Sequence, residues 1–300
     1  MKEQTDIPAC PATQRLFIGS ASRLRHCGVL AGAVLTLLWP LAAQAVLTDY
    51  QTAVKAEASL ISYYTFDSSN AADTKAAHAG TLAGTTAFAS GIGGFGKALV
   101  LNGAGRVNLG VVGAFAFTND NSGSVEAWVN AGNLNGDATV FANRDGYSRW
   151  DVHLTSDKSA IGMWNGVSYL TVAIPNASTN WHHLAVVFES AYFTVYWDGA
   201  WAGSLSLPLG YTDFTKSTQI GSPSPNGDAL QSWVGMLDEV AIYSAPLTAA
   251  AVQTHYQAFF AGTAPVIVKQ PQGGTYIRGA VLSLSAQADG GKMTYQWYKG

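Results

Sequence analysis

Short segments rich in β-branched and aromatic residues recur between residues 60 and 243, and each is bounded by Gly, Asn or Asp. Segments punctuated in this way are typical of antiparallel strands joined by tight turns. Strands and long helices do not alternate, which disfavours a parallel α/β fold. The predicted strands span 60–66, 98–101, 105–109, 125–129, 139–142, 151–154, 160–164 and 169–174. We therefore predict an all-β protein in which two antiparallel sheets form a sandwich.

One hairpin and two short helices complete this prediction. The pair Asp198-Gly199 accepts positive backbone angles and predicts a tight turn between strands over 192–197 and 201–207. Thr48 and Gln51 have the spacing of a capping box, which predicts a short helix before residue 57. A second helix is predicted over 249–260. Both helices are expected at the periphery of the sandwich.

The first 45 residues have the order of charge and hydropathy found in secretory signal peptides. Residues 1–25 carry scattered basic side chains, 28–43 form an apolar run, and Ala43-Gln44-Ala45 supplies small residues for cleavage. An uncleaved anchor is the alternative, but the run is shorter than the roughly 20 residues of a spanning helix. We expect 1–45 to be a signal peptide cleaved after Ala45. The mature protein is then secreted or on the cell surface, without membrane insertion.

Cysteine usage and charge restrict the mature chain further. Cys10 and Cys27 both lie inside the predicted signal peptide, so core packing must stabilise the remaining chain without disulfides. Removing the signal peptide takes away four basic and two acidic residues and moves the net charge from −3 to −5. Phosphate binding needs clustered Lys and Arg. We therefore expect no nucleic-acid partner.

Several segments carry a resemblance to a known family. One is GMLDEVAIY over residues 235–243, which precedes the second predicted helix; another is Trp181-His182-His183, and a third is GGFGKALVLNG over residues 93–103. Over residues 50–256 the chain resembles the laminin-G-like, concanavalin A-like jelly-roll domains of bacterial secreted proteins. The resemblance implies an antiparallel jelly-roll domain over residues 46–262. Such domains serve glycan binding, adhesion or spacing between other domains, so the fold alone does not choose among these functions.

A second β pattern begins after a linker-like segment near residue 263. Residues 266–268, 279–286 and 295–299 are similar to the first strands of bacterial immunoglobulin-like domains, with Trp297 at the position of the buried strand-C tryptophan. A complete domain of this kind has about 100 residues. We expect 263–300 to be a linker and an incomplete immunoglobulin-like segment, and the natural protein to continue beyond Gly300.

The carboxylates do not indicate glycosidase chemistry. A glycoside hydrolase needs two carboxylates placed across the sugar bond, and laminarinase-like relatives carry them as Glu-x-Asp-x-Glu on one strand. Glu57, Glu126, Glu189 and Glu239 are not arranged in this way. Asp238 and Glu239 are adjacent, so on a regular strand they point to opposite faces. We expect no catalytic residues in this chain.

Asp238 is instead a candidate metal ligand, because strand alternation places it with Ile242 on a face that should be buried. A buried ionised carboxylate must be hydrogen-bonded or metal-bound. Asp67 and Asp73 resemble the Phe-Asp and the following Asp of the family pattern, although the next glycine is displaced to Gly80. Jelly rolls of this family hold calcium with carboxylate and carbonyl oxygens. We predict a structural calcium at Asp67, Asp73 and Asp238. In the alternative, Asp67 and Asp73 cap turns and Asp238 accepts backbone amides.

His182 and His183 form a second candidate metal pair. Neighbouring residues on a strand do not easily share one ion, and no Cys or Glu lies nearby in the sequence. The resemblance implies a structural role for these rings at the sheet edge, and we favour that role over metal binding.

Aromatic and polar residues near one turn are the candidates for ligand binding. Sugar sites use exposed rings for the C–H faces of the sugar and polar side chains for its hydroxyls. Arg144, Asp145, Tyr147 and Trp150 have this combination and are the predicted ligand-binding residues. The alternative for each ring is packing in the core, where burial of aromatic side chains supplies much of the folding energy.

Two functions from different classes follow from these observations. The first is a non-catalytic carbohydrate-binding or adhesive module of an exported multidomain protein, with a glycan or surface glycoprotein as partner. The second is a structural or protein-interaction spacer of a cell-surface protein. An accessory module of a secreted glycoside hydrolase, whose catalytic domain lies outside this sequence, is a third. Ligand identity and oligomeric state do not follow from these residues.

Overall fold

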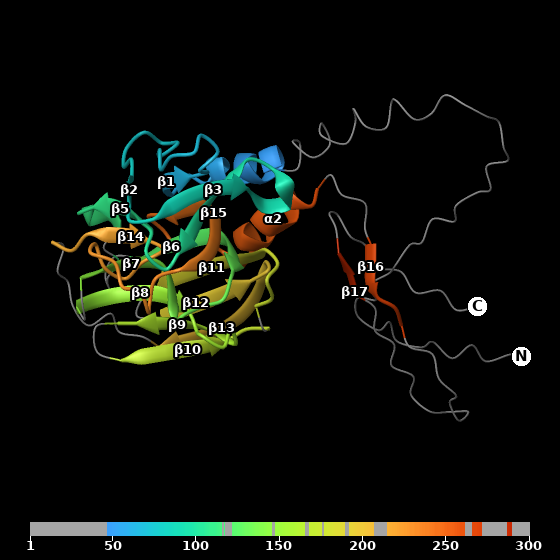
Figure 1. The fold of residues 1–300 in the computed structure, drawn as a ribbon. Helices are drawn as coiled ribbons and strands as arrows, with labels where there is room; N and C mark the ends of the chain where they lie inside the picture. Colours follow the sequence, from blue (N-terminus) through green and yellow to red (C-terminus); the bar gives the residue numbers. More distant parts are fainter. Residues whose placement is uncertain are drawn as a thin grey trace, which may run out of the picture.

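The computed structural model describes residues 47–115, 117, 122–145, 148–165, 168–175, 177–189, 192–206, 215–261, 266–271 and 287–289. Between residues 47 and 261 the described chain forms two packed β-sheets, with one helix near each end of this segment (Figure 1). Neighbouring strands within both sheets run antiparallel. This confirms the predicted all-β, two-sheet sandwich.

The first sheet contains eight strands of the described chain, and β6 lies near its centre. Strand β1 pairs with β15 beside the main path of the sheet. In spatial order the other strands are β13 (Ala200–Ser206), β12 (Tyr192–Trp197), β11 (His182–Glu189), β6 (Gly123–Ala131), β15 (Val234–Tyr243), β4 (Lys97–Asn102) and β3 (Thr86–Ser90), with β1 at Leu60–Tyr64. The predicted hairpin is confirmed, because β12 and β13 pair across Asp198 and Gly199, both with positive φ.

The second sheet contains seven strands of the described chain. In spatial order they are β10 (Tyr169–Ala173), β9 (Ala160–Trp164), β8 (Ser148–Leu154), β7 (Ala138–Asp145), β14 (Thr218–Ile220), β5 (Arg106–Gly110) and β2 (Thr81–Ala83). Strand β14 brings residue 219 between β5 and β7, which are distant in the sequence. The edge strands β10 and β13 of the two sheets approach each other at one end of the sandwich (Figure 1).

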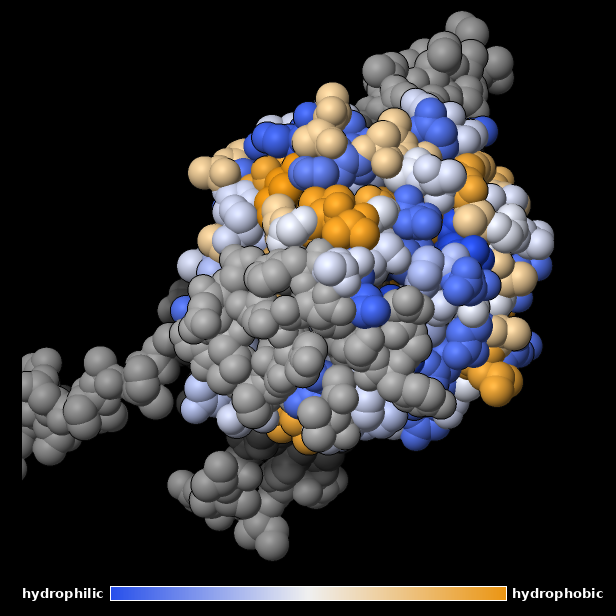
Figure 2. Space-filling view, turned by 90° about the vertical axis from the view of Figure 1, so that its left-hand side faces the viewer, coloured by the Kyte–Doolittle hydropathy of each residue, from blue (hydrophilic) through white to orange (hydrophobic). Residues whose placement is uncertain are grey.

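The main hydrophobic core fills the space between the two sheets. On β8 the residues Trp150, Val152 and Leu154 enter this core, as expected for a strand whose side chains alternate between faces. Short 3-10 turns at Ile92–Gly94 and Gly113–Phe115 lie between strands. The described surface in Figure 2 mixes hydrophilic and hydrophobic residues in small patches. The continuous apolar surface lies between the two sheets, and its burial holds the layers together.

Two helices cover the outer face of the eight-stranded sheet, away from the seven-stranded sheet. The first spans residues 47–56, and α2 spans Ala249–Phe259. Trp128 of β6 lies beneath them, with its ring centroid 5.0 Å from that of Phe259. Thr248 caps α2 by accepting a hydrogen bond from the amide of Ala251. The helix predicted before residue 57 is confirmed, although it already includes residue 47, one residue before the predicted cap at Thr48.

A β-bulge in β15 changes the face on which Asp238 lies. The pairing of β15 with β6 shifts register between Asp238 and Ala241, and Glu239 has a φ of 52°. Leu237 and Ile242 enter the core between the sheets, whereas Asp238 lies opposite Trp128 on the helix-covered face. The predicted alignment of Asp238 with Ile242 is therefore wrong, because an extra residue in a bulge reverses strand alternation.

The ends of the chain add little to this description. Residues 1–45, Cys10 and Cys27 lie outside the described residues, so the signal peptide remains a prediction. After residue 261, β16 (Val266–Lys269) and β17 (Gln287–Asp289) form an antiparallel pair. The immunoglobulin-like segment over 263–300 also remains a prediction, and Trp297 is not described. No helix in the described part of the chain is long and apolar enough to cross a bilayer.

Candidate functional site

A line of outward-facing residues crosses every strand of the seven-stranded sheet. Each member stands directly opposite the next one across a strand pair, beside residues whose side chains pack toward the core. From β2 to β10 the line contains Thr81, Asn108, Gln219, Ala142, Asp151, Trp164 and Tyr169. We call these residues the outer row. It is polar at one end, charged near its middle and aromatic at the other end.

The charged part of the outer row is a buried network around Asp151. One carboxylate oxygen of Asp151 accepts a hydrogen bond from Arg144, and the other lies 2.6 Å from Nδ1 of His153. Nη2 of Arg144 also donates to Oε1 of Gln231 at 3.1 Å. Arg144, Asp151 and His153 are all buried although they lie on the non-core face of the sheet. Ionised groups are rarely buried without such pairing.

The protonation of His153 follows from its surroundings. Burial lowers the pKa of His153 to about 4. The charge of Asp137 opposes this shift, and the smaller effect of the Arg144 charge adds to it. A neutral imidazole donates one N–H and accepts at the other nitrogen. We therefore assign the Nδ1 proton to the contact with Asp151 at neutral pH, which leaves Arg144 as the charge partner of that carboxylate.

Aromatic side chains form the β10 end of the outer row. The ring centroids of Trp164 and Tyr169 are 4.7 Å apart, and that of His153 is 5.5 Å from Tyr169. Tyr169 is 47% exposed, so one part of its ring contacts the fold and another faces solvent. An exposed ring beside polar groups is suited to stacking on the C–H face of a sugar.

The predicted ligand-binding residues do not share one surface. Arg144 belongs to the buried network of the outer row, whereas Trp150 is 2% exposed and packs in the core against Phe188, with ring centroids 4.9 Å apart. Tyr147 and the side chain of Asp145 lie outside the described residues. For Trp150 the structure agrees with the alternative of core packing.

Asp73 organises the loop that follows β1. Its carboxylate accepts hydrogen bonds from the backbone amides of Tyr63 at 2.9 Å, Lys75 at 2.9 Å, Ala77 at 3.3 Å and His78 at 3.0 Å. A carboxylate has about four lone-pair sites. These amides use that capacity, so Asp73 does not fit the role of a calcium ligand.

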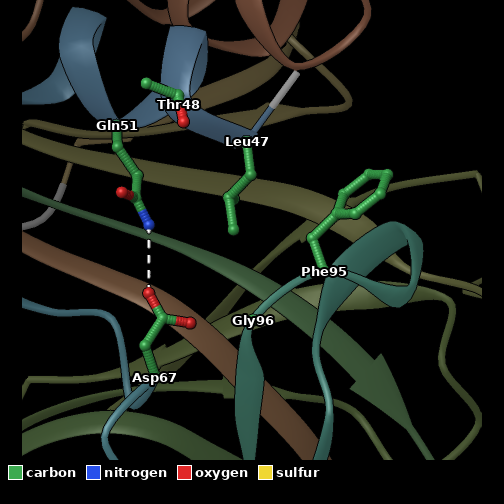
Figure 3. Close-up of a pocket in the computed structure, with 6 residues that line it drawn as sticks. All are labelled: Leu47, Thr48, Gln51, Asp67, Phe95 and Gly96. Carbon is green, nitrogen blue, oxygen red and sulfur yellow. Dashed lines mark hydrogen bonds between the residues drawn. The ribbon is translucent and has the colours of Figure 1, made fainter. Parts of the chain in front are cut away.

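Asp67 lies at an open pocket beside the first helix (Figure 3), and Asp238 is close enough for the charge of Asp67 to act on it. Leu47, Thr48, Gln51, Asp67, Phe95 and Gly96 line this pocket. Nε2 of Gln51 donates to Asp67 at 3.3 Å and to Oε1 of Glu239 at 2.9 Å, so it bridges two carboxylates. Asp238 accepts hydrogen bonds from the amides of Ile92 and Glu239. We call Asp67, Asp238 and Glu239 the acidic group.

The electrostatics of the acidic group favour neutral carboxyls or an added cation. Burial raises the pKa of Glu239 to about 8, and burial together with the charge of Asp67 raises the pKa of Asp238 well above its usual value. Oε2 of Glu239 is buried without a hydrogen-bond partner among the residues that the structure describes. However, no three His, Cys, Asp or Glu side chains of the described chain converge as a metal site. The predicted set of Asp67, Asp73 and Asp238 therefore does not fit a calcium ion, and any cation near Asp67 would also need carbonyl oxygens or water.

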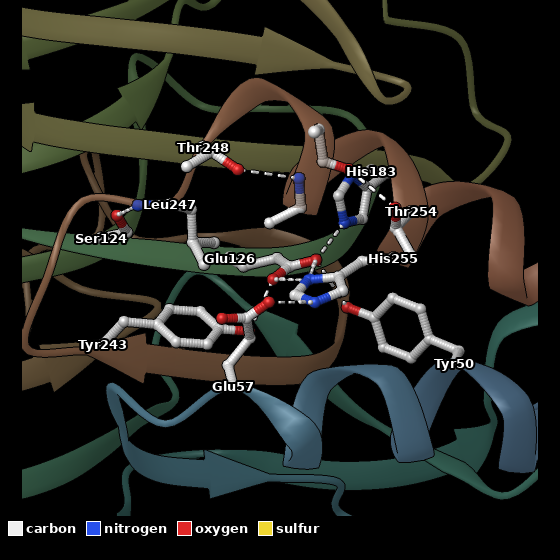
Figure 4. A network of polar contacts seen from close by, with 12 residues as sticks. Tyr50, Glu57, Ser124, Glu126, His183, Tyr243, Leu247, Thr248, Thr254 and His255 are labelled. Carbon is white, nitrogen blue, oxygen red and sulfur yellow. Dashed lines mark hydrogen bonds and ion pairs between the residues drawn. The ribbon is translucent and has the colours of Figure 1, made fainter.

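The two adjacent histidines are used in separate contacts within the fold. Nδ1 of His182 lies 2.8 Å from Oδ2 of Asp198, beside the β12–β13 turn. Nε2 of His183 lies 2.6 Å from Oε1 of Glu126 (Figure 4). These contacts agree with the structural role that we favoured for the pair.

Some residues of these sites were missed at the level of sequence. Trp150, Val152 and Leu154 alternate with Asp151 and His153, so a charged outer face of this strand was visible in the pattern. The pairing of Asp151 with Arg144 was less visible, because it depends on the register of β7 and β8. Glu126 gives no signal of this kind, since apolar neighbours flank it and its partners come from distant segments.

The two antiparallel sheets and their connections define a β-sandwich of the jelly-roll type. Residues 101–253 match the concanavalin A-like lectin/glucanases superfamily, and the chain belongs to this superfamily. This match lies within residues 50–256 and confirms the family resemblance found there. No curated protein matches the chain.

Solved structures with this fold include several binding domains. Domain 4 of AbnA, a GH43 extracellular arabinanase from Geobacillus stearothermophilus, was solved in complex with arabinotriose; it has a TM-score of 0.52 and 24% identity, covering 67% of this chain and 100% of that chain. The binding domain of Paraclostridial Mosquitocidal Protein 1 has a TM-score of 0.53 and 16% identity, covering 67% of this chain and 52% of that chain. The receptor binding domain of botulinum neurotoxin C/D mosaic serotype has a TM-score of 0.51 and 14% identity, covering 66% and 51%. The chain spans about half of these toxin domains, and at such identities the similarity shows the fold alone.

Proposed function

We propose that this chain is a non-catalytic carbohydrate-binding module of an exported protein, and that it binds glycan at the aromatic end of the outer row. The observation that carries this proposal is the half-exposed ring of Tyr169 beside Trp164, in register with the charged centre of the sheet. The arabinotriose complex of domain 4 of AbnA supports it, because that domain shares the fold over its full length. The apolar run before Ala45 supports export.

The outer row also supports a non-catalytic role. Glycosidases of this kind place two carboxylates across the scissile bond. The outer row carries one carboxylate, Asp151, and its oxygens contact Arg144 and His153. Both oxygens of this carboxylate are therefore engaged within the fold, and no second carboxylate of the outer row faces it.

Titration calorimetry against neutral oligosaccharides, including arabinotriose, tests this proposal. Tyr169→Ala is expected to weaken binding at least tenfold, which corresponds to about 1.4 kcal/mol. Tyr192→Ala is the matched control, because Tyr192 is 55% exposed on β12 of the other sheet. Equal loss in both variants, or no binding of any oligosaccharide by the unaltered chain, would sink the glycan proposal.

The second function, a structural or interaction spacer, is favoured by the burial of Arg144, Asp151 and His153. If the chain is a spacer, the network only stabilises the sheet. The same holds if the chain is an accessory module of a glycoside hydrolase and its outer row binds nothing. The spacer function predicts that Tyr169→Ala leaves every measured binding unchanged. The same titration therefore separates the two functions.

We also propose that a calcium ion binds at the open pocket beside Asp67, and that its charge favours the ionised forms of Asp238 and Glu239 behind it. Two observations support this site: Oε2 of Glu239 has no hydrogen-bond partner in the described part of the chain, and Asp67 lines the pocket. Native-state binding raises the melting temperature by mass action. We expect calcium to raise it relative to chelator in the unaltered chain and in Asp73→Asn, but not in Asp67→Asn. No shift at millimolar calcium would refute the site.

A further inference from the structure

One fully buried carboxylate on β6 joins elements from both ends of the sandwich domain. Glu126 accepts hydrogen bonds from the hydroxyl of Tyr243 at 2.6 Å and the hydroxyl of Tyr50 at 3.3 Å. Its oxygens also lie 2.6 Å from Nε2 of His183 and 2.9 Å from Nδ1 of His255 (Figure 4). All of these side chains are buried.

The partners of Glu126 come from four different elements. Tyr50 belongs to the helix over residues 47–56, and His255 belongs to α2. His183 and Tyr243 belong to β11 and β15, the two strands that pair with β6. The helices at the two ends of the domain thus share one acceptor, which lies in the sheet beneath both.

We propose that Glu126 is the common anchor of the two terminal helices, so that loss of its charge releases both helices from the sheet together. This inference is independent of the proposed glycan site, which lies on the other sheet. The helices also pack through apolar side chains such as Val54 and Val252, but those contacts are non-directional. The shared carboxylate supplies directional contacts to both helices at once, whereas Gln51 orients the first helix alone through Asp67 and Glu239.

The charges around Glu126 explain why its removal affects both helices. A buried charge is tolerated when it is paired and hydrogen-bonded, and removing one member leaves the others unsatisfied. The ionisable groups that face this site are Tyr50, Glu57, Glu126, His183, Tyr243 and His255, and Glu239 acts on the tyrosines through its charge. Nε2 of His255 also reaches Glu57 at 3.4 Å, which adds a second negative partner.

The pKa values give the direction of the pH dependence. Contacts with His183 and His255 overcome burial and hold the pKa of Glu126 well below its usual value. The stability from this group is therefore present above the unfolded pKa and is lost as pH falls through the folded one. Burial opposes protonation of His255, but Glu126 and Glu57 raise its pKa overall. Its contribution is full below the unfolded pKa and is lost as pH rises through the folded value.

Native-state hydrogen exchange of the complete chain tests the shared anchor. In Glu126→Gln, we expect amides of residues 47–56 and of α2 to exchange at least tenfold faster, while amides of β8 and β9 keep their protection. Glu57→Gln is the matched control, because Glu57 contacts His255 but not Tyr50 in the network. Because Glu57 directly follows the first helix but contacts only His255 of this network, the control is expected to speed exchange in both helices much less than Glu126→Gln does, and an equal effect would overturn the proposal.

A double-mutant cycle of Tyr50→Phe and His255→Asn gives a second readout and remains available if Glu126→Gln does not fold. Because both residues contact the same carboxylate, we expect their effects on helix opening to be coupled by about threefold or more. Additive effects, faster exchange in only one helix of Glu126→Gln, or equal acceleration in β8 and β9 would each overturn the proposal.

Discussion

Replacing Asp73 with alanine removes the acceptor of four backbone amides, one within β1 and three in the loop that follows it. The amide of Tyr63 lies in a buried strand, so losing its carboxylate acceptor leaves a desolvated donor and costs about 1–3 kcal/mol. The other amides belong to the loop over residues 75–78, where water compensates much of the loss. We therefore expect Asp73→Ala to lower the free energy of unfolding by about 3 kcal/mol.

The assay is urea unfolding together with a thermal melt of the mature chain. For a domain of this size, about 3 kcal/mol corresponds to a fall of about 6–12 °C in Tm. Asp157→Ala is the control, because Asp157 accepts hydrogen bonds only within an exposed turn, from Thr155 and Ser159 among the described residues. A loss below about 1 kcal/mol in Asp73→Ala, or an equal loss in the control, would refute the reasoning.

Other perturbations test the core and the buried ionisable groups. Trp150→Ala should lower the free energy of unfolding by about 3–5 kcal/mol in denaturant unfolding, because Trp150 packs against Phe117 and Phe188; weakened glycan binding with unchanged stability would contradict this. Glu239 has a folded pKa of about 8, above its ordinary value, so its contribution to stability should fall as pH rises from about 4.5 through 8. Glu239→Gln should flatten that slope in melts across this range, and an unchanged slope would count against it. His153 has a folded pKa of about 4, below its ordinary value, so stability should fall as pH drops from about 6.5 to 4; His153→Gln should remove this dependence in the same melts.

The fold followed from the sequence because short punctuated strands and the Asp198-Gly199 turn are local signals. The face of Asp238 did not follow, since strand alternation holds only without a bulge, and the bulge at Glu239 depends on pairing with β6. The pattern of Phe66-Asp67 followed by Asp73 marked Asp73 in the sequence as a candidate functional residue. Its partners were not, because they are backbone amides brought together by the loop.

The sequence by itself determined the sandwich, its superfamily pattern and the supply of aromatic and acidic side chains. Only the tertiary structure decided which of these side chains are buried and what they contact. Trp150 and Tyr169 are both aromatic residues near turns, yet register places one in the core and the other on the outer row. Glu126 finds Tyr50 and His255 across distances of 76 and 129 residues in the chain. Local propensity does not encode such pairings, because they form only when packed sheets and helices bring distant segments into contact.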